Sequence, residues 1–271
     1  MTKFKDKTVL ITGGASGIGK LMAQKILSLG AAKMIIWDIN RENLENTINE
    51  LKAPVFEIFS YQVDVANMEK VKQTAQKVKD EVGIVDILIN NAGVVVGKFF
   101  HEHSHQDIDF TMNINTSALM HITLEFIPDM MKKGEGHIVN IASAAGMVAN
   151  PKMSVYCASK WSVIGWSDSL RLEMERIHKK IKVTTVTPYY ISTGMFDGVK
   201  SKLIPIINPE KAVRKIVRGV IKNKIFVRMP GIIYWLPLIK GILPARWFDF
   251  IVGKGFGVYK SMDEFKGHKN S

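Results

Sequence analysis

Three residues in the middle of the chain have the types and spacing to move a proton. Tyr156 and Lys160 lie four residues apart in SVYCASK, and Ser143 lies thirteen residues before the tyrosine. If residues 154–178 form a helix, the phenol and the ammonium share one face, where the cation can stabilise a phenolate. Because such a pair also arises by chance in many helices, this interpretation depends on the rest of the chain.

A glycine-rich loop near the N-terminus is typical of a dinucleotide site. The segment TGGASGIG, residues 12–19, follows an apolar run and precedes a stretch whose apolar residues recur with helical period. Glycine lets the backbone turn tightly and approach a pyrophosphate, while free N–H groups at the helix start hold the negative charge. We therefore expect Gly13, Gly17 and Gly19 to admit the phosphates of a nucleotide.

An acid at the end of the second apolar run favours NAD over NADP. Residues 34–37 lead into Asp38, nineteen residues beyond Gly19, where a carboxylate can accept hydrogen bonds from the adenosine ribose hydroxyls. A carboxylate also repels a 2′-phosphate, and no basic residue precedes Gly17 in the loop to compensate. The alternative is that Asp38 only caps a helix that begins near Arg41.

Short apolar runs alternate with amphipathic stretches, which predicts an α/β fold with a parallel sheet covered by helices on both faces. The strands are expected at residues 8–12, 34–37, 57–63, 87–89, 137–141, 183–187 and 225–227. Asn208-Pro209-Glu210 predicts a helix that continues to about residue 223. Residues 189–208 would then hold the substrate loop. The expected strand order is 3-2-1-4-5-6-7.

Together these features resemble the short-chain dehydrogenase/reductase family over roughly residues 5–230. The matching positions are Thr12, Gly13, Gly17, Gly19, Asp64, Asn90, Asn91, Ala92, Gly93, Asn115, Ser143, Tyr156 and Lys160. The resemblance implies a Rossmann-type, doubly wound, seven-stranded sheet. Shorter matches at residues 193–196 and 261–267 resemble the branch that contains retinol and 17-beta-hydroxysteroid dehydrogenases. One departure is Pro188-Tyr189, where many members of the family have Pro-Gly.

The resemblance implies a role for each site residue. Tyr156 would be the acid or base, Lys160 would also hold the nicotinamide ribose, and Ser143 would hydrogen-bond the substrate oxygen. Asn115 would support a water relay to Lys160. The expected cofactor-binding residues are Thr12, Gly13, Ser16, Gly17, Ile18, Gly19, Asp38, Asp64, Val65, Asn91, Ala92, Gly93, Tyr156, Lys160, Pro188, Ile191 and Thr193. Taken singly, Ser143 could be a turn serine and Asn115 a polar residue on an exposed helix face.

The expected substrate pocket is apolar. It would be lined by Ser143, Met147, Val148, Tyr189, Tyr190, Met195 and Phe196. This favours NAD(H)-dependent interconversion of a primary or secondary alcohol and its carbonyl on a retinoid, steroid or fatty alcohol, by a homodimer or homotetramer. One alternative is a 3-oxoacyl or small-carbonyl reductase. Another is a catalytically silent, NAD-sensing protein that binds a membrane or a partner, although the complete Asn-Ser-Tyr-Lys set argues against silence.

Composition fits a single enzyme with one large core. The chain has 271 residues, 46% of them hydrophobic, and one cysteine, Cys157, so an intramolecular disulfide is excluded. No apolar leader precedes the first predicted strand, so we expect a cytoplasmic protein, for which peripheral membrane contact stays open. The alternating histidines of residues 101–105 are of the type that binds metals, but no cluster of acids or cysteines completes a ligand set, and we expect no metal.

The C-terminal part of the chain carries nearly all of the net charge. Residues 198–271 hold fifteen Lys or Arg against four Asp or Glu, which is eleven of the twelve net positive charges. We expect residues 1–229 to form the catalytic domain and residues 230–271 a basic, apolar extension. Its apolar runs fit lipid better than nucleic acid, while its charges and prolines argue against a helix that spans a bilayer. A lid over the pocket, a subunit interface and contact with an anionic membrane all remain open for it.

Overall fold

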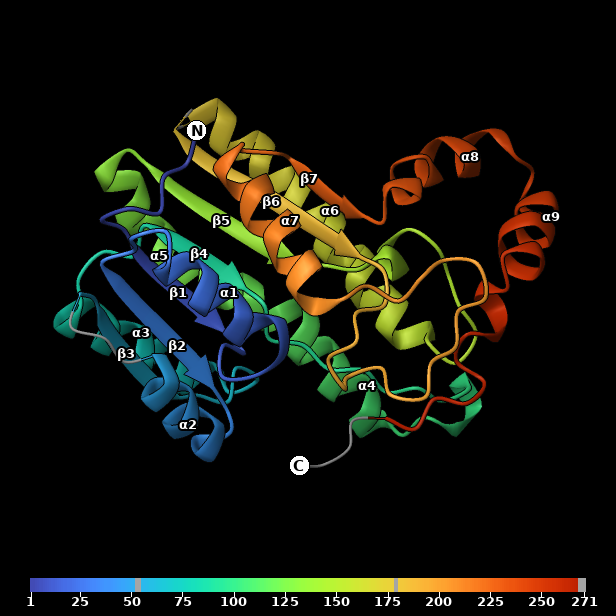
Figure 1. Ribbon diagram of the computed structural model, residues 1–271, viewed down its shortest axis with the longest axis horizontal. Coiled ribbons are helices and arrows are strands. Elements are labelled where there is room, and N and C mark those ends of the chain that lie inside the picture. The colour runs from blue at the N-terminus through green and yellow to red at the C-terminus, as the bar shows by residue number, and fades with distance from the viewer. Residues whose placement is uncertain (52–54, 178–179, 268–271) are drawn as a thin grey trace.

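The computed structural model describes residues 1–51, 55–177 and 180–267, and it is built on a seven-stranded parallel sheet (Figure 1). The strands are β1 (Thr8–Thr12), β2 (Lys33–Asp38), β3 (Glu57–Gln62), β4 (Ile87–Asn90), β5 (Gly136–Ile141), β6 (Ile181–Pro188) and β7 (Phe226–Met229). Their spatial order is β3-β2-β1-β4-β5-β6-β7. The predicted fold class and strand order are therefore confirmed.

Helices cover both faces of the sheet, as expected for parallel strands that are buried on two sides (Figure 1). On one face lie α1 (Gly17–Leu27), α2 (Arg41–Leu51) and α7 (Pro209–Ile221). On the other lie α3 (Met68–Glu81), α5 (Ala118–Lys133) and α6 (Ser154–Ile177), with α4 (His105–Met112) leading into α5. The predicted last residue of α6, His178, lies outside the described residues.

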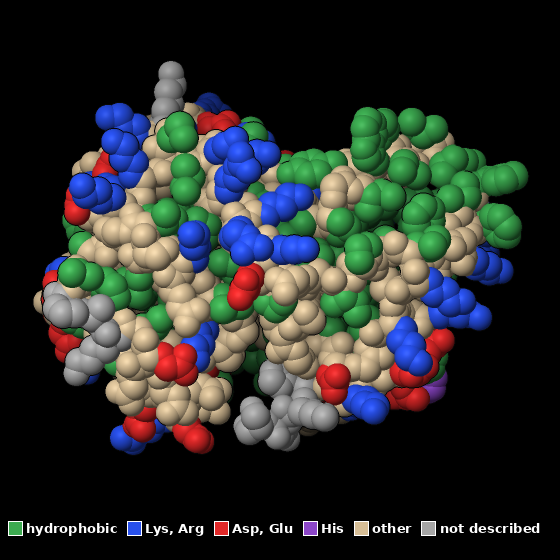
Figure 2. Space-filling view, in the orientation of Figure 1, with side chains coloured by type: hydrophobic (Ala, Val, Ile, Leu, Met, Phe, Trp, Pro, Cys, Tyr) green, Lys and Arg blue, Asp and Glu red, His purple; other side chains and the backbone are tan. Residues whose placement is uncertain are grey.

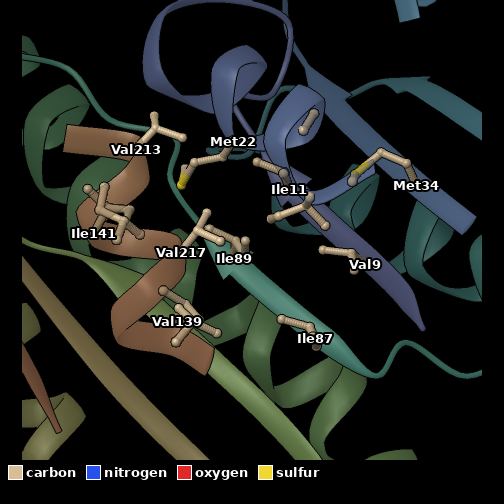
Figure 3. Packing of buried hydrophobic residues seen from close by; sticks show 14 of the residues in the cluster. Val9, Ile11, Met22, Met34, Ile87, Ile89, Val139, Ile141, Val213 and Val217 are labelled. Carbon is tan, nitrogen blue, oxygen red and sulfur yellow. The ribbon is translucent and has the colours of Figure 1, made fainter. Parts of the chain in front are cut away.

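The larger core joins α1 and α7 to the middle strands (Figure 3). On α1 the buried apolar side chains Met22, Ala23, Ile26 and Leu27 recur with helical spacing. They meet Val9 and Ile11 of β1, while Val213 and Val217 of α7 reach Val139 and Ile141 of β5. This packing fixes the strand ends at which the site is built.

Helix boundaries follow local capping chemistry. The Asn208 side chain accepts a hydrogen bond from the backbone N–H of Lys211, and Pro209 occupies the first turn of α7. Asn67 caps α3 in the same way through the N–H of Lys70. Gly134 ends α5 in the left-handed conformation that glycine adopts without strain.

Beyond β7 the chain leaves the sheet and forms what we call the cap, residues 230–260. It contains α8 (Leu236–Ile242), α9 (Ala245–Phe248) and short irregular helical turns, and it projects to one side of the sheet (Figure 1). Residues 261–267 then run back along the body, where Phe265 packs directly on Gly97. Within the described part of the chain, no helix combines the length and apolar character that crossing a membrane requires.

Candidate active site

A cleft of about 570 Å³ opens at the carboxyl ends of the strands, beside the point where the sheet order reverses between β1 and β4. Such a switch point is where doubly wound sheets bind nucleotides. Of the residues expected to bind a cofactor, the cleft is lined by Gly13, Ser16, Gly17, Ile18, Asp38, Asp64, Val65, Asn91, Ala92, Gly93, Tyr156, Lys160, Pro188, Ile191 and Thr193. Thr12 and Gly19 are not among its lining residues.

Gly19 instead brings α1 against the glycine loop. A Cβ atom at Gly19 would lie 2.0 Å from the carbonyl oxygen of Gly13, so only glycine allows this approach. Gly13 has φ of +60° and contacts the backbone of Ala92. The Ser16 side chain makes no capping hydrogen bond at the start of α1, so first-turn N–H groups stay available to an anion. The loop therefore fits a dinucleotide pyrophosphate.

Thr12 ties the two central strands together behind the cleft. Its Oγ1 accepts hydrogen bonds from the backbone N–H groups of Asn91, at 3.0 Å, and Ala92, at 3.1 Å. The Asn91 side chain donates in return to the carbonyl oxygens of Thr12 and Gly13, at 3.0 and 2.9 Å. The loops after β1 and β4 are thereby held as one unit.

Asp38 faces the same loop from the end of β2. One carboxylate oxygen accepts from the N–H of Ala15 at 3.0 Å and the other from the N–H of Asn40 at 3.1 Å. Thr47 supports the loop from α2 by donating to the carbonyl oxygen of Ala15 at 2.9 Å. Asp38 thus positions the loop and also lines the cleft.

Helix α6 brings Tyr156 and Lys160 to the floor of the cleft, and both side chains are buried. Lys160 Nζ donates to the carbonyl oxygen of Ile141 at 3.1 Å and lies 5.7 Å from the centroid of the Tyr156 ring. Ser143, at the end of β5, accepts from the N–H of Ala145 at 3.1 Å, so it caps a turn and lines the cleft at once. The three residues singled out by spacing share one cleft.

Burial sets the electrostatics of this group. It raises the pKa of Tyr156 well above its ordinary value, and a hydrogen bond with Ser143 offsets only part of that rise. Burial also lowers the pKa of Lys160 to about 8. Both shifts disfavour the charged forms, so the protein alone holds the phenol neutral.

Asn115 is fully buried rather than exposed on a helix face. It lies in the short π-helix Asn113–Ser117 between α4 and α5. Its amide accepts from the N–H of Val94 at 2.8 Å and donates to the Val94 carbonyl at 2.9 Å and to Ser159 Oγ at 3.1 Å. A Cβ on Gly93 would lie 3.2 Å from Asn115 Oδ1 and 3.5 Å from Lys160 Nζ, so glycine keeps the two side chains close.

An apolar cavity of about 50 Å³ adjoins the cleft, and Ser143, Tyr189 and Phe196 line both. Of the residues expected in the substrate pocket, Val148 and Tyr190 also line this cavity, whereas Met195 lines the cleft. Met147 is buried against the cap and lines neither. Ligand pockets usually span about 300–1,000 Å³, so a lipid alcohol would have to displace wall side chains to enter.

The cap supplies residues that sequence analysis did not assign to the site. The inner side chains Ile233, Leu236, Val252 and Val258 line the cavity, together with Asn150, Met153 and Ile204 of the body. Ile233 and Leu236 are three residues apart, which is a helical spacing. The spacing predicts that they share one face of a helix, but it does not show whether that face meets the pocket or the solvent. For Asn150 the sequence carries no signal, because its place depends on the turn after β5.

Comparison with known proteins agrees with this geometry. The family model described as short chain dehydrogenase matches residues 7–203. This chain belongs to the short-chain dehydrogenase/reductase family of oxidoreductases. It is 36% identical over 266 residues to epidermal retinol dehydrogenase 2 of Mus musculus, covering 96% of this chain and 85% of that protein. It is 35% identical over 247 residues to estradiol 17-beta-dehydrogenase 11 of Homo sapiens, covering 91% and 82%.

Solved structures show the same architecture. A short-chain dehydrogenase/reductase from Burkholderia phymatum in complex with NAD superposes with a TM-score of 0.81 at 25% identity, covering 93% of this chain and 97% of that one. A metagenomic short-chain oxidoreductase in complex with NADP gives a TM-score of 0.71 at 25% identity, covering 84% and 97%. One of these structural neighbours thus binds NAD and the other binds NADP.

The histidine run lies away from the cleft of this dehydrogenase/reductase. His101 and His105 are exposed, and the centroid of the His103 ring lies 6.3 Å from the centroid of the Phe100 ring. Among residues 1–51, 55–177 and 180–267, no group of three or more His, Cys, Asp or Glu side chains is placed to hold a metal ion.

The glycine loop gives a direct test of the cleft. Gly19→Ala should weaken cofactor binding by at least about tenfold, because the added methyl group must push the Gly13 carbonyl and the loop out of place. Gly165→Ala is the matched control, since a Cβ there meets nothing within 4 Å and alanine favours a helix. Titration of tryptophan fluorescence with NADH measures both, and equal affinities for the two variants would contradict this reading of the loop.

Proposed function

We propose that this protein interconverts an apolar alcohol and its carbonyl with NAD(H), using Tyr156 as the acid or base. The observation that supports this most directly is the shared cleft, in which Tyr156, Lys160 and Ser143 meet the glycine loop on one side and the apolar cavity on the other. The retinol and estradiol dehydrogenases among its relatives favour a retinoid, steroid or fatty alcohol.

In this proposal Ser143 orients the substrate oxygen toward the Tyr156 phenol, which removes the hydroxyl proton in oxidation and returns it in reduction. Lys160 stands behind the ring and stabilises the phenolate that forms. When bound, the nicotinamide supplies the hydride acceptor or donor and, in its oxidised form, a positive charge near the phenol. Because burial keeps the phenol neutral in the protein alone, proton removal is coupled to cofactor binding.

Hydrogen bonds to the backbone hold the side chains of the site in place. Asn115 clamps the Val94 peptide, and the Ile141 carbonyl holds the Lys160 ammonium in place. The expected water relay would run from Lys160 past Gly93 and Asn115, which lie close together. The Phe196 ring packs edge to face on the Tyr156 ring, with 6.0 Å between the ring centroids, and would shield the apolar side of the phenol from water.

We further propose that the cap binds an anionic bilayer through its outer face, which would deliver substrate to the cavity. Figure 2 shows hydrophobic side chains gathered over α8 and α9, and those more than half exposed are Trp235, Leu238, Ile242, Trp247 and Phe250. Opposite them, Ile233, Leu236 and Val252 line the cavity. The cap therefore has an apolar outer face one helix away from an apolar site.

The charge of the cap favours a lipid surface over a second copy of the chain as the partner of its outer face. Arg246, Lys254 and Lys260 are exposed on the cap, whereas the side chain of its one acid, Asp249, accepts from the Tyr259 hydroxyl. Two such faces would bring like charges together, while an anionic membrane attracts them. Lys240 has another task, since its Nζ lies 4.0 Å from the centroid of the Trp161 ring and donates to the Met147 carbonyl, holding the cap to the body.

Removal of one oxygen tests the proposed reaction. Tyr156→Phe should lower kcat by more than the roughly 10²- to 10⁴-fold usual for a general acid or base, because the other phenol that lines the cleft, Tyr189, is hydrogen-bonded to Ser201 Oγ. NAD binding should persist, since the ribose and phosphate contacts are untouched. Turnover of retinol, estradiol and dodecanol measures this, with Tyr61→Phe, on the distant strand β3, as control. Near-normal turnover by Tyr156→Phe would revive the silent NAD-sensing alternative.

Cofactor preference should reside in Asp38. The ratio of kcat/KM for NAD to that for NADP should fall by about tenfold or more in Asp38→Ala, because a charged hydrogen-bond acceptor worth about 1.5–3 kcal/mol and its repulsion of a 2′-phosphate are both lost. Thr47→Val is the control, since it disturbs the same loop at Ala15 without removing the carboxylate. A wild-type preference for NADP, or an unchanged ratio in Asp38→Ala, would refute the assignment.

Membrane contact should be peripheral and salt-sensitive. Each basic residue near the surface contributes about 1 kcal/mol, and the attraction decays over roughly 8 Å at physiological ionic strength. Flotation with phosphatidylserine liposomes at low salt should recover the wild type and should recover much less of the Trp247→Ser/Phe250→Ser double variant. Leu124→Ser/Leu172→Ser, exposed apolar positions on α5 and α6, should float like the wild type. Wild-type protein that stays at the bottom but dimerises would assign the face to a subunit interface.

A further inference from the structure

One polar side chain of the apolar cavity wall has an atom without a partner among the described residues. Asn150 lines the cavity and is 8% exposed, and its side-chain oxygen Oδ1 is buried without a hydrogen bond. The hydroxyl groups of the two tyrosines in the wall do have partners, because Tyr189 contacts Ser201 Oγ at 3.2 Å and Tyr190 contacts Ser261 Oγ at 3.0 Å. Buried acceptors are rarely left unpaired, so this one calls for a donor.

The hydrogen bonds around Asn150 fix which end of its amide is free. Ser261 Oγ donates to the Val258 carbonyl at 2.7 Å, so toward Asn150 it can only accept. The amide nitrogen therefore faces Ser261, at 2.9 Å, and also Tyr190 OH, at 3.0 Å. If the amide were reversed, Asn150 Oδ1 would face Ser261 Oγ, and two acceptors would meet without a proton between them. The nitrogen is hydrogen-bonded within the wall, and the oxygen is the end of the amide without a partner.

We propose that Asn150 Oδ1 is a second recognition point of the substrate cavity and accepts a hydrogen bond from a hydroxyl group that the substrate carries away from its reacting carbon. The substrate class is then an apolar compound with two hydroxyl groups, or with one hydroxyl and the reacting carbonyl. This inference rests on the proposed function, since it takes the carbon beside Ser143 as the reacting one.

The surroundings of Asn150 explain why the group would select its ligand. Ala144, Ala145, Val148, Leu236, Val252 and Val258 supply apolar walls. In such a cavity a ligand hydroxyl that leaves water must find an acceptor, while a ligand without a donor leaves Oδ1 unpaired. Sites built around a substrate hydroxyl discriminate more strongly than sites that only measure apolar size.

The test compares matched ligands that differ in one donor. The pairs are 1,12-dodecanediol with 12-methoxydodecan-1-ol, and estradiol with its 3-methyl ether, so that a flexible and a rigid skeleton are both sampled. Dissociation constants are measured by equilibrium dialysis on full-length Tyr156→Phe protein with NAD, where turnover does not interfere. In at least one pair the compound with the free remote hydroxyl should bind about tenfold or more tightly.

Variants assign that preference to one atom. Asn150→Leu, in the same background, should bring the affinity ratio close to one, because leucine fills the space without an acceptor. Ser201→Ala should keep the preference, since it removes a hydroxyl that contacts Tyr189 of the wall and leaves the hydrogen bonds of the Asn150 amide intact. If Asn150→Leu does not fold, Asn150→Ala replaces it. A ratio near one in the parent protein, which indicates that water satisfies Oδ1, or a preference that survives loss of Asn150, would overturn the inference.

Turnover by the wild-type chain separates this inference from the proposed function. Equal kcat/KM values for both members of each pair would leave the alcohol dehydrogenase activity standing and remove the second recognition point. Tighter binding of the diol without turnover of any compound would support the recognition point and contradict the proposed reaction.

Discussion

The burial of the Lys160 ammonium beside the Tyr156 phenol is the constraint on which the site depends. A buried cation needs compensation, and the structure offers the carbonyl oxygen of Ile141 at the end of β5. The position of the Ile141 carbonyl is fixed because β5 pairs in parallel with β4 and β6. The same pairing brings Ser143 to the cleft. Helical spacing on α6 then fixes the phenol relative to the cation.

The same constraint reaches the neighbouring loop and helix. Gly93 lets the loop after β4 pass close to Lys160, and Asn115 holds the next peptide from a helix that is locally widened. Thr12 and Asn91 connect that loop to the glycine loop. The proposed cofactor site and the proposed proton-transfer group are therefore parts of one hydrogen-bonded unit, which supports coupling of proton removal to cofactor binding.

Much of this was predictable from the sequence, because parallel strands buried on both faces read as short apolar runs and the switch point follows from their order. Gly13, Gly17 and Asp38 were identified for chemical reasons, and the structure brings them to one cleft, while Gly19 packs against the glycine loop. Asp38 also accepts hydrogen bonds from the N–H groups of Ala15 and Asn40, whereas the helix that begins at Arg41 is capped by the Asn40 side chain, which accepts from the N–H of Asn43.

What the sequence could not provide depends on contacts between distant segments. Asn150 meets Ser261 across 111 positions of the chain, and Phe265 reaches Gly97 only because residues 261–267 return to the body. The two-faced character of the cap is equally hidden, since Trp235 and Leu236 are neighbours in sequence but lie on opposite sides, one exposed and one in the cavity wall. Periodicity indicates that a face exists, and only the fold shows what it contacts.

The central claim is that a hydride passes between an apolar alcohol and the nicotinamide while Tyr156 holds the proton. The most direct measurement is incubation of the full-length protein with NAD and a lipid alcohol fully deuterated at the carbinol carbon, followed by mass spectrometry of the reduced cofactor. The account predicts NADH heavier by one deuterium, in amounts equal to the carbonyl product. Carbonyl product with unlabelled NADH, or cofactor left oxidised with every lipid alcohol offered, would contradict it.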